Sequence, residues 1–130
     1  MTDASGCMSW QPPEVLNGAK RSSSMDIFSL GCVFYYVLSC GSHPFTNKQS
    51  NVQNTLTNIL QNKSDISSIM SFPEAYDLIS RMISAYREQR PSMDDVLSHC
   101  MFWDNEKKLR FIMDFSDHLE FLNQAHPTVK

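Results

Sequence analysis

The chain has 130 residues, which fits one domain, and 42% of them are hydrophobic, enough to build a core. Its net charge of -3 argues against a nucleic-acid-binding face driven by bulk charge, because such a face needs clustered Lys and Arg side chains. No pair of cysteines has the C-x-x-C spacing of zinc or redox motifs, so we expect free thiols in a reducing compartment. The first fifteen residues lack the basic start and apolar stretch of a signal peptide.

The first half of the chain is expected to hold one central helix after an irregular start. Residues 1–24 carry glycines, prolines and a serine run, which disfavour regular structure. Residues 25–39 are apolar almost all round, and their length favours a helix, although residues 33–37 would suit a strand by propensity. A helix that is apolar on every side is expected to be buried, and Gly41 is placed to end it. Its apolar part, residues 27–38, is too short for a transmembrane segment.

Two amphipathic helices are expected in the middle of the chain, separated by a polar, serine-rich loop over residues 62–71. The first begins at Asn51. Its apolar face would be formed by Val52, Leu56, Ile59 and Leu60. The second begins near Pro73, which suits the first turn of a helix. Its apolar residues recur at helical spacing: Ala75, Leu78, Ile79, Met82, Ile83 and Tyr86.

The last third is expected to contain a short capped helix and then a longer one. Ser92 is followed three residues later by Asp95, which is a variant of the capping box at a helix start. The core side of this helix would be formed by Met93, Val96 and Leu97. The final helix carries Leu109, Ile112 and Met113, then Leu119 and Leu122 after a break at Ser116. Residues 124–130 are expected to fray, and the whole chain is expected to be mainly α.

Four short strings occur in an order that is typical of protein kinases. They read WQPPE at residues 10–14, DIFSLG at 26–31, GSHPF at 41–45 and RPS at 90–92. Together they resemble the C-terminal (large) lobe of a protein kinase from the A-P-E motif onward, over roughly residues 5–103. The resemblance implies an incomplete kinase-like fold. Its structural motif residues would be Pro13, Glu14, Asp26, Gly31 and Arg90.

The resemblance also points to one particular group of protein kinases. Residues 26–45 resemble the inositol-requiring sensors of the unfolded-protein response, whose serine/threonine kinase is joined to an endoribonuclease on the cytosolic face of the endoplasmic reticulum. Residues 102–120 resemble the junction into their ribonuclease domain. This implies a kinase-lobe fragment over residues 1–104 and a truncated start of the ribonuclease domain over residues 105–130, in a chain that is itself soluble. Ribonuclease L, which shares the two-domain plan, is the nearest alternative.

The resemblance assigns roles to individual residues. Glu14 and Arg90 would form a buried ion pair, although by sequence separation alone they could be unrelated surface charges. Asp26 suits the positive end of a helix and, in kinases, also accepts backbone hydrogen bonds from the catalytic loop. Cys7 and Ser9 replace the threonine and second glycine of the family's Gly-Thr-x-Gly-Trp string, which weakens the case for protein-substrate binding.

Kinase chemistry needs a glycine-rich phosphate loop, a lysine with its glutamate, a catalytic aspartate and a magnesium-binding aspartate. None occurs in context in this sequence. The string DFS at residues 114–116 imitates the magnesium motif, but it follows the A-P-E equivalent and has the wrong third residue. We therefore expect no catalytic, cofactor-binding or metal-binding residue here; ATP and magnesium are implied for the full-length family alone.

The expected partners follow from this incompleteness. They are a missing upper lobe or a full-length homologous kinase, while a protein substrate and RNA follow only from the resemblance. Two rival hypotheses are a non-catalytic interaction module, whose exposed lobe face would bind a partner, and a fragment of an ordinary protein kinase. The segment 111–120 argues against the second, because an ordinary kinase would not carry such a tail.

Overall fold

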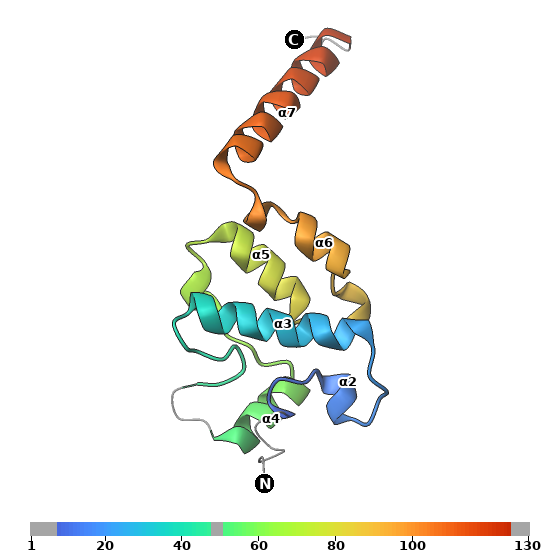
Figure 1. Cartoon of the computed structure of the whole chain (residues 1–130), viewed down its shortest axis with the longest axis vertical. Helices are drawn as coiled ribbons and strands as arrows, with labels where there is room; N and C mark the ends of the chain where they lie inside the picture. The colour runs from blue at the N-terminus through green and yellow to red at the C-terminus, as the bar shows by residue number, and fades with distance from the viewer. Residues whose placement is uncertain (1–7, 48–50, 126–130) are drawn as a thin grey trace. The chain divides into compact units, whose positions relative to one another are not determined.

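The computed structural model describes residues 8–47 and 51–125 (Figure 1). Within them every regular element is helical, which confirms the mainly α fold. The α-helices are α2 (Pro13–Leu16), α3 (Ser23–Leu38), α4 (Val52–Leu60), α5 (Pro73–Met82), α6 (Met93–Ser98) and α7 (Asn105–Ala125). Three short 3-10 helices are η1 (Ser67–Ile69), η2 (Arg87–Gln89) and η3 (Cys100–Phe102). None of the described helices is both long enough and apolar enough to cross a bilayer.

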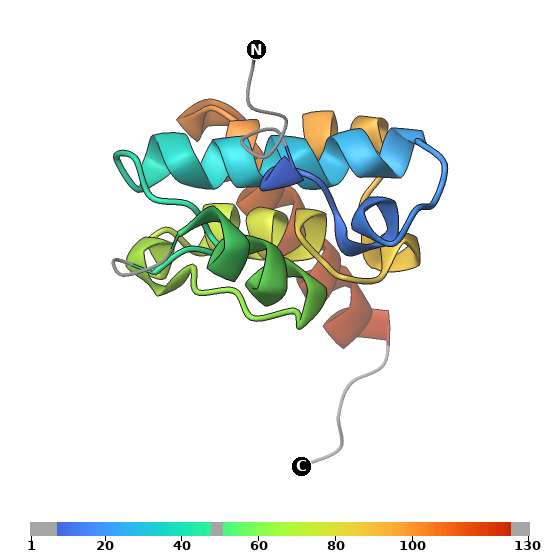
Figure 2. The same ribbon diagram turned by 90° about the horizontal axis from the view of Figure 1, so that it is seen from below.

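The chain divides into two compact units, Met1–Leu97 and Ser98–Lys130. In the first unit α5 packs against α3. Figure 1 shows the two helices inclined to each other, and Figure 2 gives the view from below. The side chains of Phe28 and Cys32 on α3 and of Leu78 and Met82 on α5 are fully buried. The ring of Phe28 also stacks on Phe45 at a centroid distance of 5.6 Å. The core of this unit therefore lies along the contact between α3 and α5.

One face of α3 departs from the prediction of a helix buried all round. Val33, Tyr36 and Val37 are exposed by 45%, 46% and 68%. Val33 and Val37 lie on the side of α3 away from the buried positions, and Tyr36 beside them is partly covered by the ring of Trp10. The sequence predicted the helix correctly, but its apolar residues exceed what the described elements can bury.

The stretch predicted as irregular, residues 1–24, contains helix in its described part. Pro12 is extended and buried, and Pro13 is the first helical residue of α2, where its fixed φ is compatible with a helix and its missing N–H costs nothing. α3 begins at Ser23, two residues before the predicted start, after Ser22 in an extended conformation. Proline and serine here mark helix starts rather than irregular chain.

Helix α4 starts where predicted, and its buried face includes the predicted Ile59 but is shifted toward Thr55. The Asn51 side chain caps the helix by accepting a hydrogen bond of 2.9 Å from the Asn54 amide. Thr55 and Ile59 are buried, whereas Val52 and Leu60 are exposed. Burial of Thr55 is tolerated because its hydroxyl is within hydrogen-bond distance of the Thr46 hydroxyl (2.8 Å) and of the Asn51 carbonyl oxygen (3.2 Å). The following loop, predicted as polar and serine-rich, also holds η1 and buries Ile66 and Ile69.

Helix α5 buries the face predicted for it up to the end of the helix. Ala75, Leu78, Ile79 and Met82, together with Ile83 directly after them, are buried. Tyr86, predicted to join them, is 65% exposed. The helix ends at Met82 and Tyr86 is extended, so the helical period no longer sets its direction.

The capping box at α6 is confirmed. The Asp95 amide donates to the Ser92 hydroxyl (3.2 Å), and the Ser92 amide donates to the Asp95 carboxylate (3.1 Å). Of the three residues predicted to face the core, Val96 is buried, but Met93 and Leu97 are exposed. A helix of six residues makes fewer than two turns, and here only one side chain reaches the core.

The second unit contains η3 and α7. Asp104 caps α7 by accepting a hydrogen bond of 2.7 Å from the Lys107 amide. The helix runs through Ser116 without the predicted break and ends at Ala125, so Gln124 and Ala125 are helical. One exposed serine is too weak a helix breaker to interrupt it. The rest of the predicted frayed tail, residues 126–130, lies outside the described residues. No residue of α7 is buried, and its large apolar side chains, among them Phe111, Phe115 and Leu119, are exposed.

Candidate functional site

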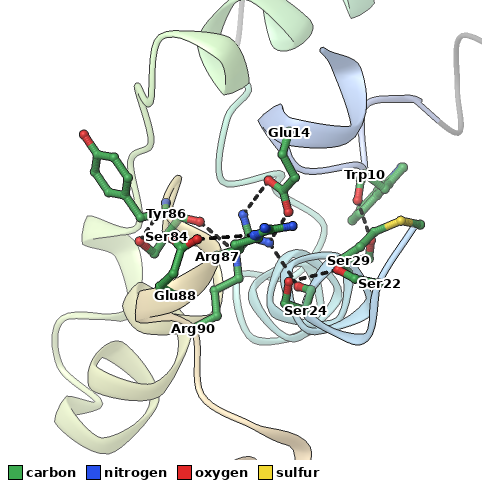
Figure 3. A network of polar contacts seen from close by, with 11 residues as sticks. Trp10, Glu14, Ser22, Ser24, Ser29, Ser84, Tyr86, Arg87, Glu88 and Arg90 are labelled. Carbon is green, nitrogen blue, oxygen red and sulfur yellow. Dashed lines mark hydrogen bonds and ion pairs between the residues drawn. The ribbon is translucent and has the colours of Figure 1, made fainter. Parts of the chain in front are cut away.

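A buried arginine joins three segments of the first unit (Figure 3). Arg90 Nη1 and Nη2 donate to Glu14 Oε1 and Oε2 at 2.6 and 2.9 Å, which makes a bidentate pair. Nη1 also donates to the carbonyl oxygen of Ser24 on α3 at 3.1 Å, and Nε donates to the carbonyl oxygen of Ser84 at 2.8 Å. Every nitrogen of the guanidinium group therefore has an acceptor, and the group ties α2, the start of α3 and the loop after α5 together.

The pair lies in a largely desolvated place. The side chain of Arg90 is 0% exposed and that of Glu14 is 19% exposed. The guanidinium carbon lies 5.1 Å from the ring centroid of Phe28, a cation–π arrangement. Burial by itself raises the pKa of the Glu14 carboxyl, but the hydrogen bond from Arg90 and its charge outweigh this, so the net pKa is lowered. Glu14 is consequently held as a carboxylate. The ion pair expected from the sequence is present.

Asp26 lies in the first turn of α3, where its negative charge suits the positive helix end. Its side chain is exposed and, among the described residues, has no hydrogen-bond or ion-pair partner. It borders a shallow groove of about 390 Å³ that is also lined by Ser24, Ile27, Arg90 and Met93. The carboxylate is thus available to a partner that supplies N–H groups.

An exposed stripe of α3 continues from this carboxylate. Asp26, Val33 and Val37 follow one another at spacings of seven and four residues, so they lie on one side of the helix. Tyr36 flanks Val37 and is likewise exposed. We call these four residues the α3 stripe. A charged end followed by large apolar side chains is typical of a surface that another protein segment covers.

The remaining two motif residues have structural positions. Pro13 opens α2, the helix that carries Glu14. Gly31 lies at the closest approach of α3 to α5: a Cβ atom added there would be 2.7 Å from Met82 Cβ and 2.9 Å from Ile83 Cγ2. Only glycine allows the two helices to pack at this distance.

The remaining sequence features lie elsewhere in the chain or outside the described residues. Cys7 lies outside the described residues, so its part in the altered string has no structural account. Asp114, Phe115 and Ser116 are part of the exposed helix α7 and do not form a metal-binding loop. The main-chain acceptors of Ser24 and Ser84 were not predicted, because a carbonyl oxygen leaves no signal in a sequence. The same holds for the aromatic contact between Phe28 and Arg90.

The described residues do not fit the cofactors of a kinase. They contain no group of three or more His, Cys, Asp or Glu side chains placed to hold a metal ion. The lone carboxylate of Asp26 is not accompanied by a phosphate-binding lysine or a glycine-rich turn in its groove.

Comparison with known proteins agrees with this structural interpretation. The family model for the protein kinase domain matches residues 1–102. The probable serine/threonine-protein kinase ireA of Dictyostelium discoideum is 41% identical over 128 residues, which are 98% of this chain and 12% of that protein. The serine/threonine-protein kinase/endoribonucleases IRE1a of Arabidopsis thaliana and IRE2 of Homo sapiens are each 39% identical, over 95% and 96% of this chain and 14% of their own lengths.

The chain belongs to the protein kinase domain family. The buried Glu14–Arg90 pair and the helices around α3 fit this class of protein. Within it, the resemblance to kinase/endoribonucleases of the inositol-requiring type is confirmed by the names of these relatives. The chain spans about one eighth of the length of the relatives it matches.

Proposed function

We propose that this chain is part of a serine/threonine protein kinase/endoribonuclease of the endoplasmic-reticulum unfolded-protein response. Residues 1–104 supply the base of the kinase large lobe, and residues 105–130 begin the ribonuclease domain. The names of the relatives and their identity across residues on both sides of this boundary support the proposal. The compact unit that ends at Leu97 supports a boundary in this region.

The observation that carries the proposal is the α3 stripe. Asp26 has no partner among the described residues, and Val33, Tyr36 and Val37 next to it are exposed. In the longer kinase, this face packs against the catalytic loop and the segments that precede residue 1 in the relatives. ATP and magnesium are then bound by those other segments, and the cytosolic face of the endoplasmic reticulum is the location of the whole protein.

In this arrangement the present residues do not perform phosphoryl transfer. The Glu14–Arg90 pair fixes α2 to α3, α3 fixes the orientation of Asp26, and Asp26 accepts hydrogen bonds from backbone N–H groups of the catalytic loop. A loop that is anchored in this way keeps a catalytic aspartate in a constant place, which is the main requirement of phosphoryl transfer. The role of this chain is therefore positional.

A non-catalytic interaction module is the second candidate, and the same α3 stripe favours it. If the chain acts by itself, the stripe binds a homologous kinase in place of that kinase's own segment. Both candidates require association through α3, and they differ in whether the native protein is longer than this chain.

Association can be tested with two matched variants. The chain is mixed with the separately expressed upper lobe and catalytic loop of an IRE1-type relative, and binding is measured by calorimetry. We expect binding that Val37→Asp weakens at least tenfold, because it buries a charge in the apolar contact. Val52→Asp on α4, where the side chain is 42% exposed, serves as the control and leaves binding unchanged. Absence of binding, or equal losses in both variants, contradicts the proposal.

A further inference from the structure

His43 joins the loop after α3 to the segment that leads into α2. Its Nε2 atom lies 2.8 Å from the carbonyl oxygen of Ser9, and its Nδ1 atom lies 3.1 Å from the amide nitrogen of Phe45. A carbonyl oxygen can only accept a hydrogen bond and a backbone N–H can only donate one. The two contacts are therefore satisfied together by one form of the ring alone, the neutral tautomer with its hydrogen on Nε2.

Aromatic packing makes this ring part of a larger contact. The ring of Trp10 meets His43 edge-on at a centroid distance of 4.6 Å and meets Tyr36 of α3 at 5.9 Å. Ser29 of α3 also donates a hydrogen bond of 2.7 Å to the carbonyl oxygen of Trp10. The segment of residues 8–11 is thus held between α3 and the loop that contains His43.

The surroundings of His43 offer little compensation for a positive charge. Burial lowers the pKa of His43, and the hydrogen bond to Ser9 offsets this only in part. His43 lines a groove together with Tyr35 of α3 and with Lys63 and Asp65 after α4. Lys63 and Asp65 carry charges of opposite sign. In the described part of the chain, neither of them forms a hydrogen bond or ion pair with His43. Phe45 and Trp10, which touch the ring, carry no charge.

We propose that His43 is a pH-sensitive clamp that releases residues 8–11 from the loop after α3 on mild acidification. A proton taken from solvent by Nδ1 places a second N–H opposite the Phe45 amide, where two donors now face each other. The ring must turn to separate them, and its turn breaks the Nε2 hydrogen bond to Ser9 and the edge contact with Trp10. This inference concerns the chain's own residues and does not rest on the proposed function.

The whole chain can report the event by NMR, because its two indole N–H groups act as probe and internal control. Trp10 contacts the clamp, whereas Trp103 Nε1 donates to Ser98 in the second unit at 3.0 Å. We expect the ring nitrogens of His43 to show the Nε2–H tautomer at neutral pH and to titrate below the ordinary histidine pKa of about 6.5. The Trp10 indole resonance shifts with the same midpoint, the Trp103 resonance does not, and helical circular dichroism is retained.

His43→Gln separates the clamp from other titrating groups. Its side-chain amide can still donate to the Ser9 carbonyl oxygen but takes no charge in this range, so the Trp10 shift is lost. The wild-type titration decides the matter even if this variant fails to fold. The proposal is overturned if the Trp10 resonance stays fixed while His43 titrates, or if the Nδ1–H tautomer is found. It is equally overturned if helical circular dichroism is lost at the same midpoint, since the whole unit would then unfold.

Discussion

Arg90 and Glu14 are 76 positions apart in the sequence, yet they meet through two parallel hydrogen bonds of 2.6 and 2.9 Å. The arginine is entirely enclosed, and its remaining hydrogen bonds go to carbonyl oxygens of Ser24 and Ser84. The pair therefore connects the beginning of the first unit to its end. Its main effect is to fix where α2 lies against α3.

Removing the arginine should destabilise the first unit strongly. Arg90→Ala leaves the Glu14 carboxylate and two carbonyl oxygens without their donor, and breaking such a pair costs about 3–5 kcal/mol. Urea unfolding followed by circular dichroism measures the loss. Arg90→Lys keeps the charge but not the bidentate geometry, so it should recover only part of the stability lost in Arg90→Ala. A loss below about 0.5 kcal/mol in Arg90→Ala would show that the pair is dispensable.

The same pair should make stability depend on pH. The folded-state pKa of Glu14 is lowered, so its contribution is complete above the unfolded value of about 4.3 and is lost as pH falls through the folded value. Comparison of wild type with Glu14→Gln isolates this residue from other carboxyl groups. We expect the stability gap between them to shrink from about pH 5 downward. If the difference in stability between wild type and Glu14→Gln is the same at both ends of the pH titration, Glu14 does not link stability to pH.

Gly31→Ala should force α3 and α5 apart. The new methyl group would lie 2.7 Å from Met82 Cβ, a side-chain atom next to the backbone that cannot swing away. We expect a loss of about 1–3 kcal/mol in the free energy of unfolding, as for other overpacked cores. Val37→Ala on the exposed face of the same helix is the control and should change stability by less than about 0.5 kcal/mol. Equal effects of the two substitutions would disprove the close contact.

The three described cysteines should differ widely in reactivity. Burial raises the pKa of the Cys32 thiol to about 12, while Cys40 is exposed. Mass spectrometry after brief treatment with iodoacetamide at about pH 8 should therefore find Cys40 modified and Cys32 unmodified. Cys32 should react after urea is added. Rapid modification of Cys32 in the folded protein would show that α3 is not packed as described.

The parts of the fold that sequence predicted best are those with a local cause. The Ser92–Asp95 cap and the starts at Asn51 and Pro73 depend on residues within one turn, and each was found. The ion pair required the resemblance, because nothing in the spacing of Glu14 and Arg90 brings them together. What failed was the direction of side chains: Thr55 is buried and Leu60 exposed, since hydrogen bonds to Thr46 and Asn51 satisfy the threonine.

The α3 stripe shows the other limit of sequence reasoning. An apolar run over residues 25–39 predicts burial, but whether each face is covered depends on segments that lie elsewhere in the sequence. In the described chain Val37 is exposed by 68%, although its neighbours in sequence are as apolar as those of a core helix. The mismatch between composition and exposure is what points to a covering partner.

The size of the native protein decides whether this chain is part of a longer kinase/endoribonuclease. An antibody raised against residues 105–122 is used on an immunoblot of the source cells, and the band is identified by intact mass. We expect a species much larger than the 14.9 kDa of this chain, carrying kinase and ribonuclease segments on either side of these residues. A single species at 14.9 kDa would contradict membership in a longer kinase/endoribonuclease and leave the interaction module as the function of the α3 stripe.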